Sequence, residues 1–476
     1  MIEWTRRQAI VAMLAAGTVA LLGGCATSAG EGWTPQTPTV QPSREDYRAL
    51  ALEVYTYAYP LVLTDVAREL VAARAPANTL LHRRAFPDPA FPDLGSPDPD
   101  ALCSIAWLDL SKGPVVLSVP PTGGRFHTLD LMDGWTNVFA ALGKRTAGNQ
   151  RANYAIVAPD WSGALPAGVR EIRAPASSVW LHAQLLPRSR QDKAASARLQ
   201  SQYRLTPLAA WPKGQAALPP VPTLAPNTVD TDSGVAEHVA AMDAQAFFSR
   251  FAALLAQNPP ATPDQLTEQK IHALGIKAGQ PFSTTVLEPE TARAIQEGAT
   301  RALARIVAKA RGTDAAASGL WLAGTDLGRY GMDYDRRAAA AWLGLGAGLA
   351  QDTLMYRRHT DAAGQPLDGN RRYVVRFERG DLPPSTGGWS LALYDPEQES
   401  VPNPMHRYAL GSLDALSRGR DGSVEIVVQH ARPATAQRRN WLPAPAGPFS
   451  LTLRLRGPNG EALDGGWKPP QVRPLD

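Results

Sequence analysis

The chain has only two cysteines, Cys25 and Cys103, among its 476 residues. Two cysteines cannot build a disulfide framework, and they cannot supply a cysteine-based metal site. The eight histidines are scattered, and none lies three or four residues from another, so the sequence holds no local pair of histidine ligands. We therefore predict no metal site and no cofactor.

An excess of charge of one sign is also missing. The net charge is +4, with basic and acidic residues mixed along the chain. A nucleic-acid partner would need a concentrated basic face, so none is predicted. Beyond Leu22 the apolar runs are too short to cross a membrane, and we expect no membrane-spanning helix in the body of the protein.

The signatures of familiar enzymes are absent as well. The sequence has neither a His-Glu-x-x-His zinc motif nor a Gly-x-Ser-x-Gly nucleophile elbow. The glycine-rich stretch 344–348 follows an alanine-rich, helix-like segment, whereas a dinucleotide-binding turn follows a strand. Close packing or a turn is the better interpretation of these glycines. No reaction follows from motifs, and whether the protein is an enzyme stays open.

What the chain does have at its start is an export signal. Arg6 and Arg7 precede an uncharged stretch, 9–22, that is too short to span a bilayer. The stretch ends in Leu22-Gly23-Gly24-Cys25, which resembles a lipobox whose cysteine takes up a diacylglycerol. We predict a signal peptide over residues 1–25 and lipidation of Cys25; the alternative is a buried N-terminal helix with a chance cysteine.

The residue after the lipobox indicates to which membrane the protein is anchored. Ala26 is not the aspartate that retains lipoproteins at the inner membrane of enteric bacteria. By that resemblance we expect a protein of the cell envelope that is lipid-anchored to the outer membrane and faces the periplasm. Thr5-Arg6-Arg7 partly resembles a twin-arginine signal, so the export route stays open.

The body of the chain alternates between helical and strand patterns. Ser43, with Asp46 three residues later, predicts a helix start, and Pro60 predicts a kink or interruption in that helix. Short β-prone runs separated by Gly and Pro are expected at 105–108, 115–119, 154–157, 179–182, 373–377, 389–394, 424–428 and 449–453. The predicted class is α+β, mainly β, with two antiparallel β-sandwich or jelly-roll-like lobes, an N-terminal helix and a helical middle segment.

Several motifs follow one another along the chain. The first half contains 57–61 (YAYPL), 104–109 (SIAWLD) and 133–137 (DGWTN), and the second half contains 330–334 (YGMDY), 389–391 (WSL) and 440–445 (NWLPAP). The two sets resemble, in order, the bacterial domains of unknown function 1254 and 1214 (DUF1254 and DUF1214). The resemblance implies tandem β-sandwich-like domains and no established chemistry. The expected segments are a signal peptide (1–25), a tether (26–42), a DUF1254-like domain with its N-terminal helix (43–205), a proline-rich linker (206–232), a helical segment (233–345) and a DUF1214-like β-sandwich (346–476).

The chain departs from the family pattern just before its first long strand. Where relatives usually have Asn, Thr and Tyr, this sequence has Asp98, Ala101 and Cys103. If those positions bind a ligand in relatives, this copy binds it differently or not at all.

Polar and aromatic residues cluster at two places in the sequence. The first cluster comprises Asp130, Asp133, Trp135 and Asn137, with Lys144 and Arg145 nearby. Asp133, Trp135 and Asn137 would share one side of a strand, where an indole and two polar groups could bind a polyol. The alternative is a turn in which Asp and Asn cap backbone groups while Trp packs inward.

The second cluster lies in the C-terminal domain. It comprises Trp389, Tyr394, Asp395, Asn403, His406, Arg407 and Tyr408. Arg407 could clamp a carboxylate while His406 moves a proton; alternatively, Arg407 pairs with Asp395 and holds a loop in place.

Three functions remain open. The first is an envelope protein that binds a saccharide or a small organic acid between the two β lobes through Trp135, Asn137, Trp389, Tyr394 and Arg407. The second is a cofactor-free hydrolase that uses Asp133, Asp395 and His406 at the cleft between the lobes. The third is a non-catalytic structural protein of the envelope, and the oligomeric state stays open in all three.

Overall fold

The computed structural model describes residues 43–87, 97–212, 234–260, 262–312, 320–396 and 398–475. The expected signal peptide with Cys25, the tether and most of the proline-rich linker lie outside the described residues. Within the described ranges, no helix combines the length and the apolar character that a membrane crossing requires.

Helix α1 (Arg44–Ala72) begins where the sequence predicts. The Ser43 hydroxyl accepts a hydrogen bond from the Asp46 amide at 3.3 Å, and the Asp46 carboxylate accepts one from the Ser43 amide at 2.6 Å. This reciprocal pair is the predicted capping box. The helix runs through Pro60 without the interruption that the sequence allowed for, because residues 54–67 are buried and neighbouring helices support them.

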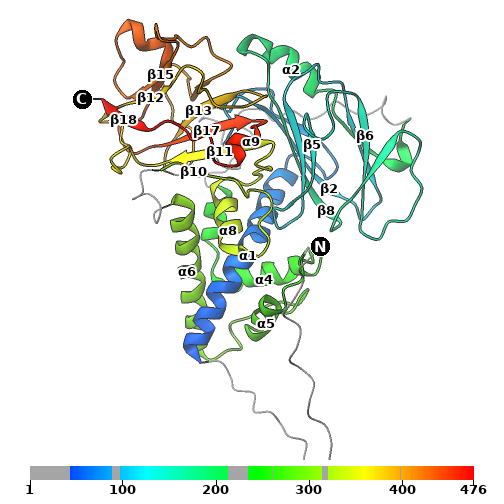
Figure 1. The fold of residues 1–476 in the computed structure, drawn as a ribbon. Helices are drawn as coiled ribbons and strands as arrows, with labels where there is room; N and C mark the ends of the chain where they lie inside the picture. The colour runs from blue at the N-terminus through cyan, green and yellow to red at the C-terminus, as the bar shows by residue number, and fades with distance from the viewer. Residues whose placement is uncertain are drawn as a thin grey trace, which may run out of the picture. The chain divides into compact units, whose positions relative to one another are not determined.

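A helical layer forms around α1. It consists of α1 together with α3 (Val235–Ala240), α4 (Ala244–Leu255), α5 (Gln265–Ala273), α6 (Pro289–Arg311) and α8 (Tyr334–Leu343). Gly298 of α6 lies directly against the backbone of α1 at Arg48, and Arg48 and Glu297 form an ion pair at 2.6 Å. Figure 1 shows α1 and α6 running side by side. The N-terminal helix and the helical middle segment therefore share one core.

The first β lobe contains two sheets. One has the strand order β1 (Leu81–His82), β2 (Leu102–Asp109), β8 (Ser178–Leu185), β4 (His127–Met132) and β5 (Val138–Gly143). The other has the order β7 (Val169–Arg173), β6 (Ala152–Val157), β3 (Val115–Val119) and β9 (Arg204–Pro207). All pairs are antiparallel except β6 with β7. The sandwich core lies between the sheets, and α2 (Lys193–Gln200) follows β8.

The second β lobe repeats this plan. One sheet has the order β10 (Leu322–Ala323), β11 (Thr353–Arg358), β17 (Ser450–Arg456), β13 (Trp389–Tyr394) and β14 (Ala409–Gly411). The other has the order β16 (Trp441–Pro443), β15 (Val424–Gln429), β12 (Arg372–Phe377) and β18 (Val472–Leu475), and the short helix α9 (Gly460–Leu463) follows β17. Leucine, valine and aromatic side chains from both sheets form its core.

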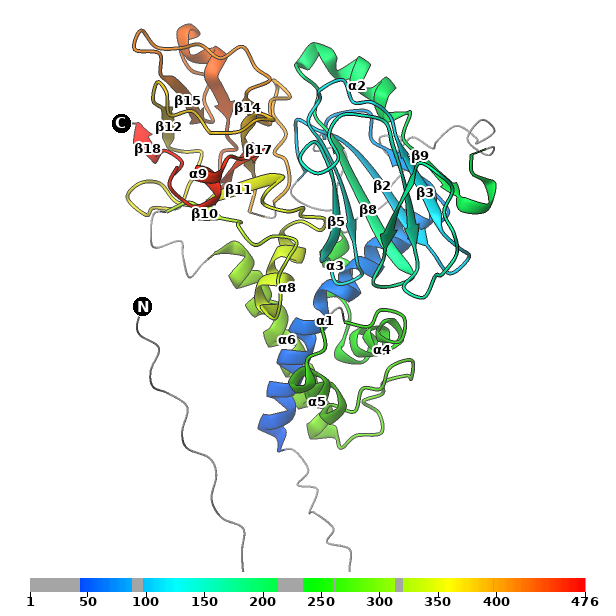
Figure 2. The same cartoon turned by 45° about the vertical axis from the view of Figure 1, so that its right-hand side comes forward.

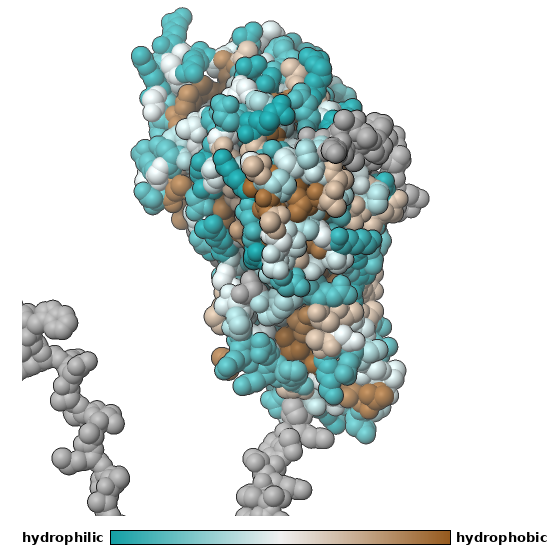
Figure 3. Space-filling model, turned by 90° about the vertical axis from the view of Figure 1, so that its right-hand side faces the viewer, coloured by the Kyte–Doolittle hydropathy of each residue, from teal (hydrophilic) through white to brown (hydrophobic). Residues whose placement is uncertain are grey.

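The predicted fold class is confirmed. Two mainly antiparallel sandwiches lie next to each other at one end of the helical layer (Figures 1 and 2). On the face shown in Figure 3, hydrophilic residues dominate and the hydrophobic ones form small, separate patches. The two sheets that contain β4 and β11 contribute the polar residues described next.

Candidate functional site

A pocket of about 90 Å³ lies between the two β lobes. One wall comes from the first lobe, through alternate residues of β2, β4 and β8; the other comes from β11 and β17 of the second lobe. The loop 344–349 after α8 closes a third side. Its lining residues on the strands are Cys103, Ile105, Thr128, Asp130, Trp180, His182, Gln184, Thr353, Met355, Arg357 and Arg454.

The pocket exists because strand side chains alternate in direction. On β4, Leu129 and Leu131 point into the sandwich core, so Thr128 and Asp130 point out of it. On β17, Leu453 and Leu455 lie in the second core, and Arg454 faces the other way. Each lobe thus turns a partly polar sheet face toward the other.

Asp130 is the least satisfied of the pocket carboxyls. It is only 3% exposed, and its Oδ1 has no hydrogen-bond partner among the described residues. Burial, together with the nearby negative charge of Asp352, raises the pKa of Asp130 to about 8. Asp130 is therefore mostly protonated at neutral pH and can donate a hydrogen bond.

The other two pocket carboxylates are paired with arginines. Asp98 accepts two hydrogen bonds, at 2.6 and 2.7 Å, from one nitrogen of Arg456, and the charge of Arg456 lowers the pKa of Asp98 against the effect of burial. Asp352 forms a two-pronged ion pair with Arg145 at 2.9 and 2.5 Å. Their negative charges are thus largely neutralised within the protein.

Arg357 is different, because no described carboxylate pairs with it. Its Nε is buried and has no hydrogen-bond partner among the described residues. Burial and the positive charge of Arg454 lower its pKa to about 10, so the guanidinium still carries its charge at neutral pH. Arg454 donates to Tyr394 Oη at 2.6 Å and approaches the Pro97 carbonyl at 3.5 Å.

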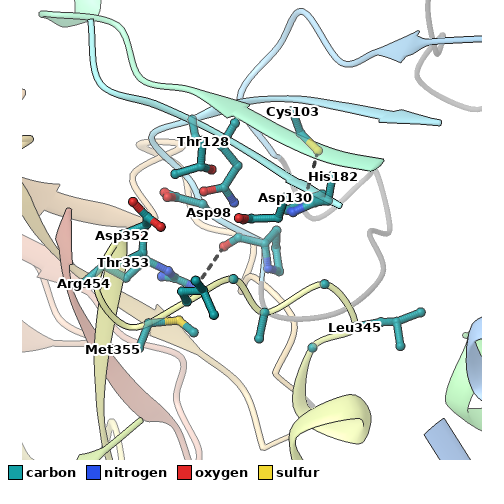
Figure 4. A pocket seen from close by; sticks show the side chains of 18 of the residues that line it. Asp98, Cys103, Thr128, Asp130, His182, Leu345, Asp352, Thr353, Met355 and Arg454 are labelled. Atoms are coloured by element: carbon teal, nitrogen blue, oxygen red, sulfur yellow. Dashed lines mark hydrogen bonds between the residues drawn. The ribbon is translucent and has the colours of Figure 1, made fainter. Parts of the chain in front are cut away.

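A thiol and an imidazole lie on the opposite wall. Cys103 Sγ is 3.4 Å from His182 Nε2. Figure 4 shows Cys103, His182 and Asp130 on one side of the pocket, and Asp352, Thr353, Met355 and Arg454 on the other. The arrangement brings together an acid, a thiol, an imidazole and two guanidinium groups from segments far apart in the sequence.

The glycines of the loop 344–348 allow it to approach the sheet. A Cβ on Gly348 would lie 2.5 Å from Asp130 Oδ2, and one on Gly346 would lie 2.7 Å from the Trp180 ring. Gly346 also has a φ of +94°, which side-chain-bearing residues rarely adopt. These glycines form a close-packed turn after a helix, which is the interpretation that the sequence favoured.

No group of His, Cys, Asp and Glu side chains with metal-binding geometry occurs among the described residues. The pocket contains two arginines, and two of its three carboxyl groups are paired with arginines, so its charged groups suit an organic anion better than a cation.

Two family descriptions match the sequence. Residues 77–207 match "Protein of unknown function (DUF1254)", and residues 352–460 match "Protein of unknown function (DUF1214)". The chain is a tandem DUF1254–DUF1214 protein. The predicted resemblance is confirmed, and β2, β4 and β8 fall in the DUF1254 match, while β11 and β17 fall in the DUF1214 match.

A solved structure with a similar fold supports this architecture. The VPA0106 protein from Vibrio parahaemolyticus is 22% identical, with a TM-score of 0.61 over 91% of this chain and all of that one. An uncharacterised protein from Burkholderia cenocepacia is 14% identical, with a TM-score of 0.45 over 91% of this chain and 95% of that one. No curated protein matches the chain.

The first predicted cluster forms a turn in the DUF1254 domain. Asp133 accepts hydrogen bonds from the Trp135 and Asn137 amides at 2.9 and 2.8 Å and from the Asn137 side chain at 3.0 Å. Trp135 is 1% exposed, contacts Tyr57 and donates to the Asn258 carbonyl at 3.2 Å. This is the turn named as the alternative, and its residues do not line the pocket.

The second predicted cluster is divided within the DUF1214 domain. Trp389 packs on Phe377 in the sandwich core. Asp395 accepts a hydrogen bond from the Glu399 amide at 2.8 Å, and His406 is exposed. Arg407 donates to the carbonyls of Arg438 and Trp441.

Of the predicted ligand-binding residues, Tyr394 comes nearest to the pocket. It does not line the pocket, but it holds Arg454, which does. The candidate catalytic residues Asp133, Asp395 and His406 are not among the pocket-lining residues.

Sequence reasoning placed Asp130 in the first cluster, and Asp130 lines the pocket. It did not identify His182, Arg357 and Arg454. One available signal did point to the pocket, since the three departures from the family pattern, Asp98, Ala101 and Cys103, all line it. A second signal was the alternation of polar with apolar residues on strands expected to be buried on one face.

Proposed function

We propose that this protein is a lipid-anchored protein of the outer membrane that binds a small organic acid between its DUF1254 and DUF1214 domains. The observation that supports the ligand is Arg357, a half-buried guanidinium whose buried Nε has no hydrogen-bond partner and which pairs with no carboxylate among the described residues. Burying an unpaired charge is costly, so such a group marks a place where a ligand anion supplies the missing partner.

The surrounding charges favour an anion as well. Asp98 and Asp352 are neutralised by Arg456 and Arg145, and Asp130 is mostly protonated at neutral pH. A bound carboxylate would therefore meet positive charge from Arg357 and a hydrogen-bond donor from Asp130, without facing an unpaired negative group in the described part of the pocket.

Size and shape favour an acid of a few carbon atoms over a saccharide. Each bound water needs roughly 10–15 Å³ of such a cavity, so about 90 Å³ holds several waters or one small acid. A sugar usually stacks on an exposed aromatic face. Trp180 lines the pocket, but its ring is stacked on Trp107 with centroids 5.1 Å apart and is fully buried.

A thermal-shift screen of the full chain in a mild detergent tests the ligand. Acetate, propionate, succinate and benzoate form one arm; phosphate and sulfate form a second; glucose and galactose form a third. A carboxylate at a hundred times its dissociation constant should raise the Tm by about 3 °C. Arg357→Gln should abolish that shift, and Arg170→Gln, on the outer strand β7, should preserve it.

A rise in Tm with phosphate or sulfate alone would indicate that the ligand is an inorganic anion and not an organic acid. A response to sugars alone, or no response in any arm, would contradict the proposed function.

The anchor is proposed from the leader sequence. An uncharged stretch after Arg6 and Arg7, ending at Cys25, is typical of a lipoprotein signal. We expect Cys25→Ser to abolish labelling by radioactive palmitate and to remove the protein from the outer-membrane fraction. A variant that is labelled and fractionates like the parent chain would contradict the anchor.

A further inference from the structure

The pocket contains a thiol beside a possible proton acceptor. Cys103 projects from β2 and His182 from the neighbouring strand β8, and the 3.4 Å distance joins Sγ to Nε2. An imidazole at this position can take the thiol proton and leave a thiolate, which is the reactive form of cysteine.

The surroundings of the thiol provide a second, independent indication of a ligand. Asp130 stands opposite His182 in the pairing of β4 with β8, and its buried Oδ1 lacks a partner among the described residues. Figure 4 shows Asp130 and His182 next to each other on the wall below Cys103. A molecule held by Arg357 and Asp130 would therefore lie in the same pocket as the sulfur.

We propose that Cys103 and His182 form a reactive thiol–imidazole pair that is modified, from within the pocket, by small electrophiles that carry a carboxylate group. The carboxylate selectivity rests on the proposed function, whereas the reactivity of the thiol does not.

The step is a simple displacement. His182 Nε2 accepts the proton of the Cys103 thiol, and the sulfur lone pair attacks the electrophilic carbon of the ligand. A C–S bond forms while the bond to the leaving group breaks, and the leaving group departs with that electron pair. For iodoacetate the products are S-carboxymethyl Cys103, iodide and a proton on His182, so no oxidant or reductant is required.

Iodoacetate and iodoacetamide provide matched probes, because they differ mainly in the charge that Arg357 would recognise. The full chain is alkylated at pH 7.5, and the label is assigned to Cys103 by mass spectrometry of its peptide. We expect the iodoacetate rate to saturate with concentration and to exceed the iodoacetamide rate at least about tenfold. Free propionate should compete with iodoacetate for the pocket and so lower the rate of alkylation by iodoacetate. The rate of alkylation by iodoacetamide should change less.

Three variants separate the parts of the proposal. Arg357→Gln should reduce the iodoacetate rate about tenfold and spare iodoacetamide. His182→Gln should lower the rate of Cys103 alkylation by both reagents. His182→Asn is a second variant at the same position, and an unchanged Tm shows that each variant is folded. Arg170→Gln, which lies away from the pocket, should change neither rate.

The outcomes distinguish this inference from the proposed function. If carboxylates raise the Tm but Cys103 reacts no faster than free cysteine with either reagent, the inference is wrong and the proposed function stands. Fast labelling without preference for iodoacetate, or a rate that His182 variants leave unchanged, would also overturn the inference.

Discussion

Asp130 is the residue whose chemistry depends most strongly on the fold. The pKa of Asp130 is raised to about 8 by burial and by the charge of Asp352, whereas in an unfolded chain it would lie near its ordinary value of 3.8. The folded protein therefore binds a proton more tightly than the unfolded chain. Stability falls as the pH rises from about 4 to about 8 and levels off above that range.

Replacing Asp130 with asparagine should remove this pH-dependent cost. We expect Asp130→Asn to be more stable than the parent chain by about 2 kcal/mol at pH 8, with little difference at pH 4. Thermal unfolding followed by calorimetry between pH 4 and pH 9 measures the change. A difference that does not vary with pH would show that Asp130 is not held protonated.

Asp98 differs from Asp130, because its pKa is lowered by the charge of Arg456, with which it pairs. The Asp98–Arg456 pair is almost fully buried, and removing the acid leaves Arg456 charged in the interior, with Asp100 at 3.5 Å and Ser390 Oγ at 3.3 Å. Asp98→Ala should destabilise the protein by about 3–5 kcal/mol, and Asp98→Asn, which keeps a hydrogen-bond acceptor for Arg456, should cost less.

The exposed pair of Arg173 and Glu171 provides the control for Asp98. Its two side chains are 43% and 39% exposed, and solvent screens their attraction. Glu171→Gln should leave the Tm unchanged. If Asp98→Ala were equally harmless, the buried pair would contribute little to stability.

At this scale the sequence singled out residues that do not line the pocket. Asp133, Trp135 and Asn137 have the composition of a ligand site, but backbone amides already occupy the Asp133 carboxylate. Residue types alone do not show which polar side chains are already hydrogen-bonded to the backbone of a turn. The departures from the family pattern were more informative, since all three line the pocket.

At the scale of the element, regular strands were predictable and polar ones were not. The expected strands at 115–119 and 389–394 coincide with β3 and β13. The strands β4 and β11 were missed, because β4 contains His127 and Asp130, and β11 contains two arginines. Such residues are unusual in strands unless one face is polar. Asp130 and Arg357 face the pocket, whereas His127 and Arg358 lie on the opposite faces of their strands.

The loop 344–348 permits a test at this scale. Gly346→Ala should destabilise the protein by about 1–3 kcal/mol, because a methyl group would meet the Trp180 ring and φ is +94°. Gly447→Ala is the matched control, since a Cβ there has open space. The two variants are compared by their Tm; equal values would mean that the loop does not pack tightly against the pocket wall.

At the scale of the whole molecule, the tandem arrangement of two β lobes was predictable from motif order, and the pocket between them was not. Asp98 and Arg456 are 358 positions apart in the chain, and Arg145 and Asp352 are 207 apart. Nothing local in a sequence specifies such pairs. They form only when both lobes assemble, so the site is a property of the assembled lobes.

The most direct test of this account is an isothermal titration of the full chain with propionate, repeated on Arg357→Gln and Arg170→Gln. We predict one-to-one binding to the parent chain and to Arg170→Gln, and at least about tenfold weaker binding, or 1.4 kcal/mol, to Arg357→Gln. Equal binding by all three proteins would contradict the assignment of the pocket as an organic-acid site, as would no binding by any of them.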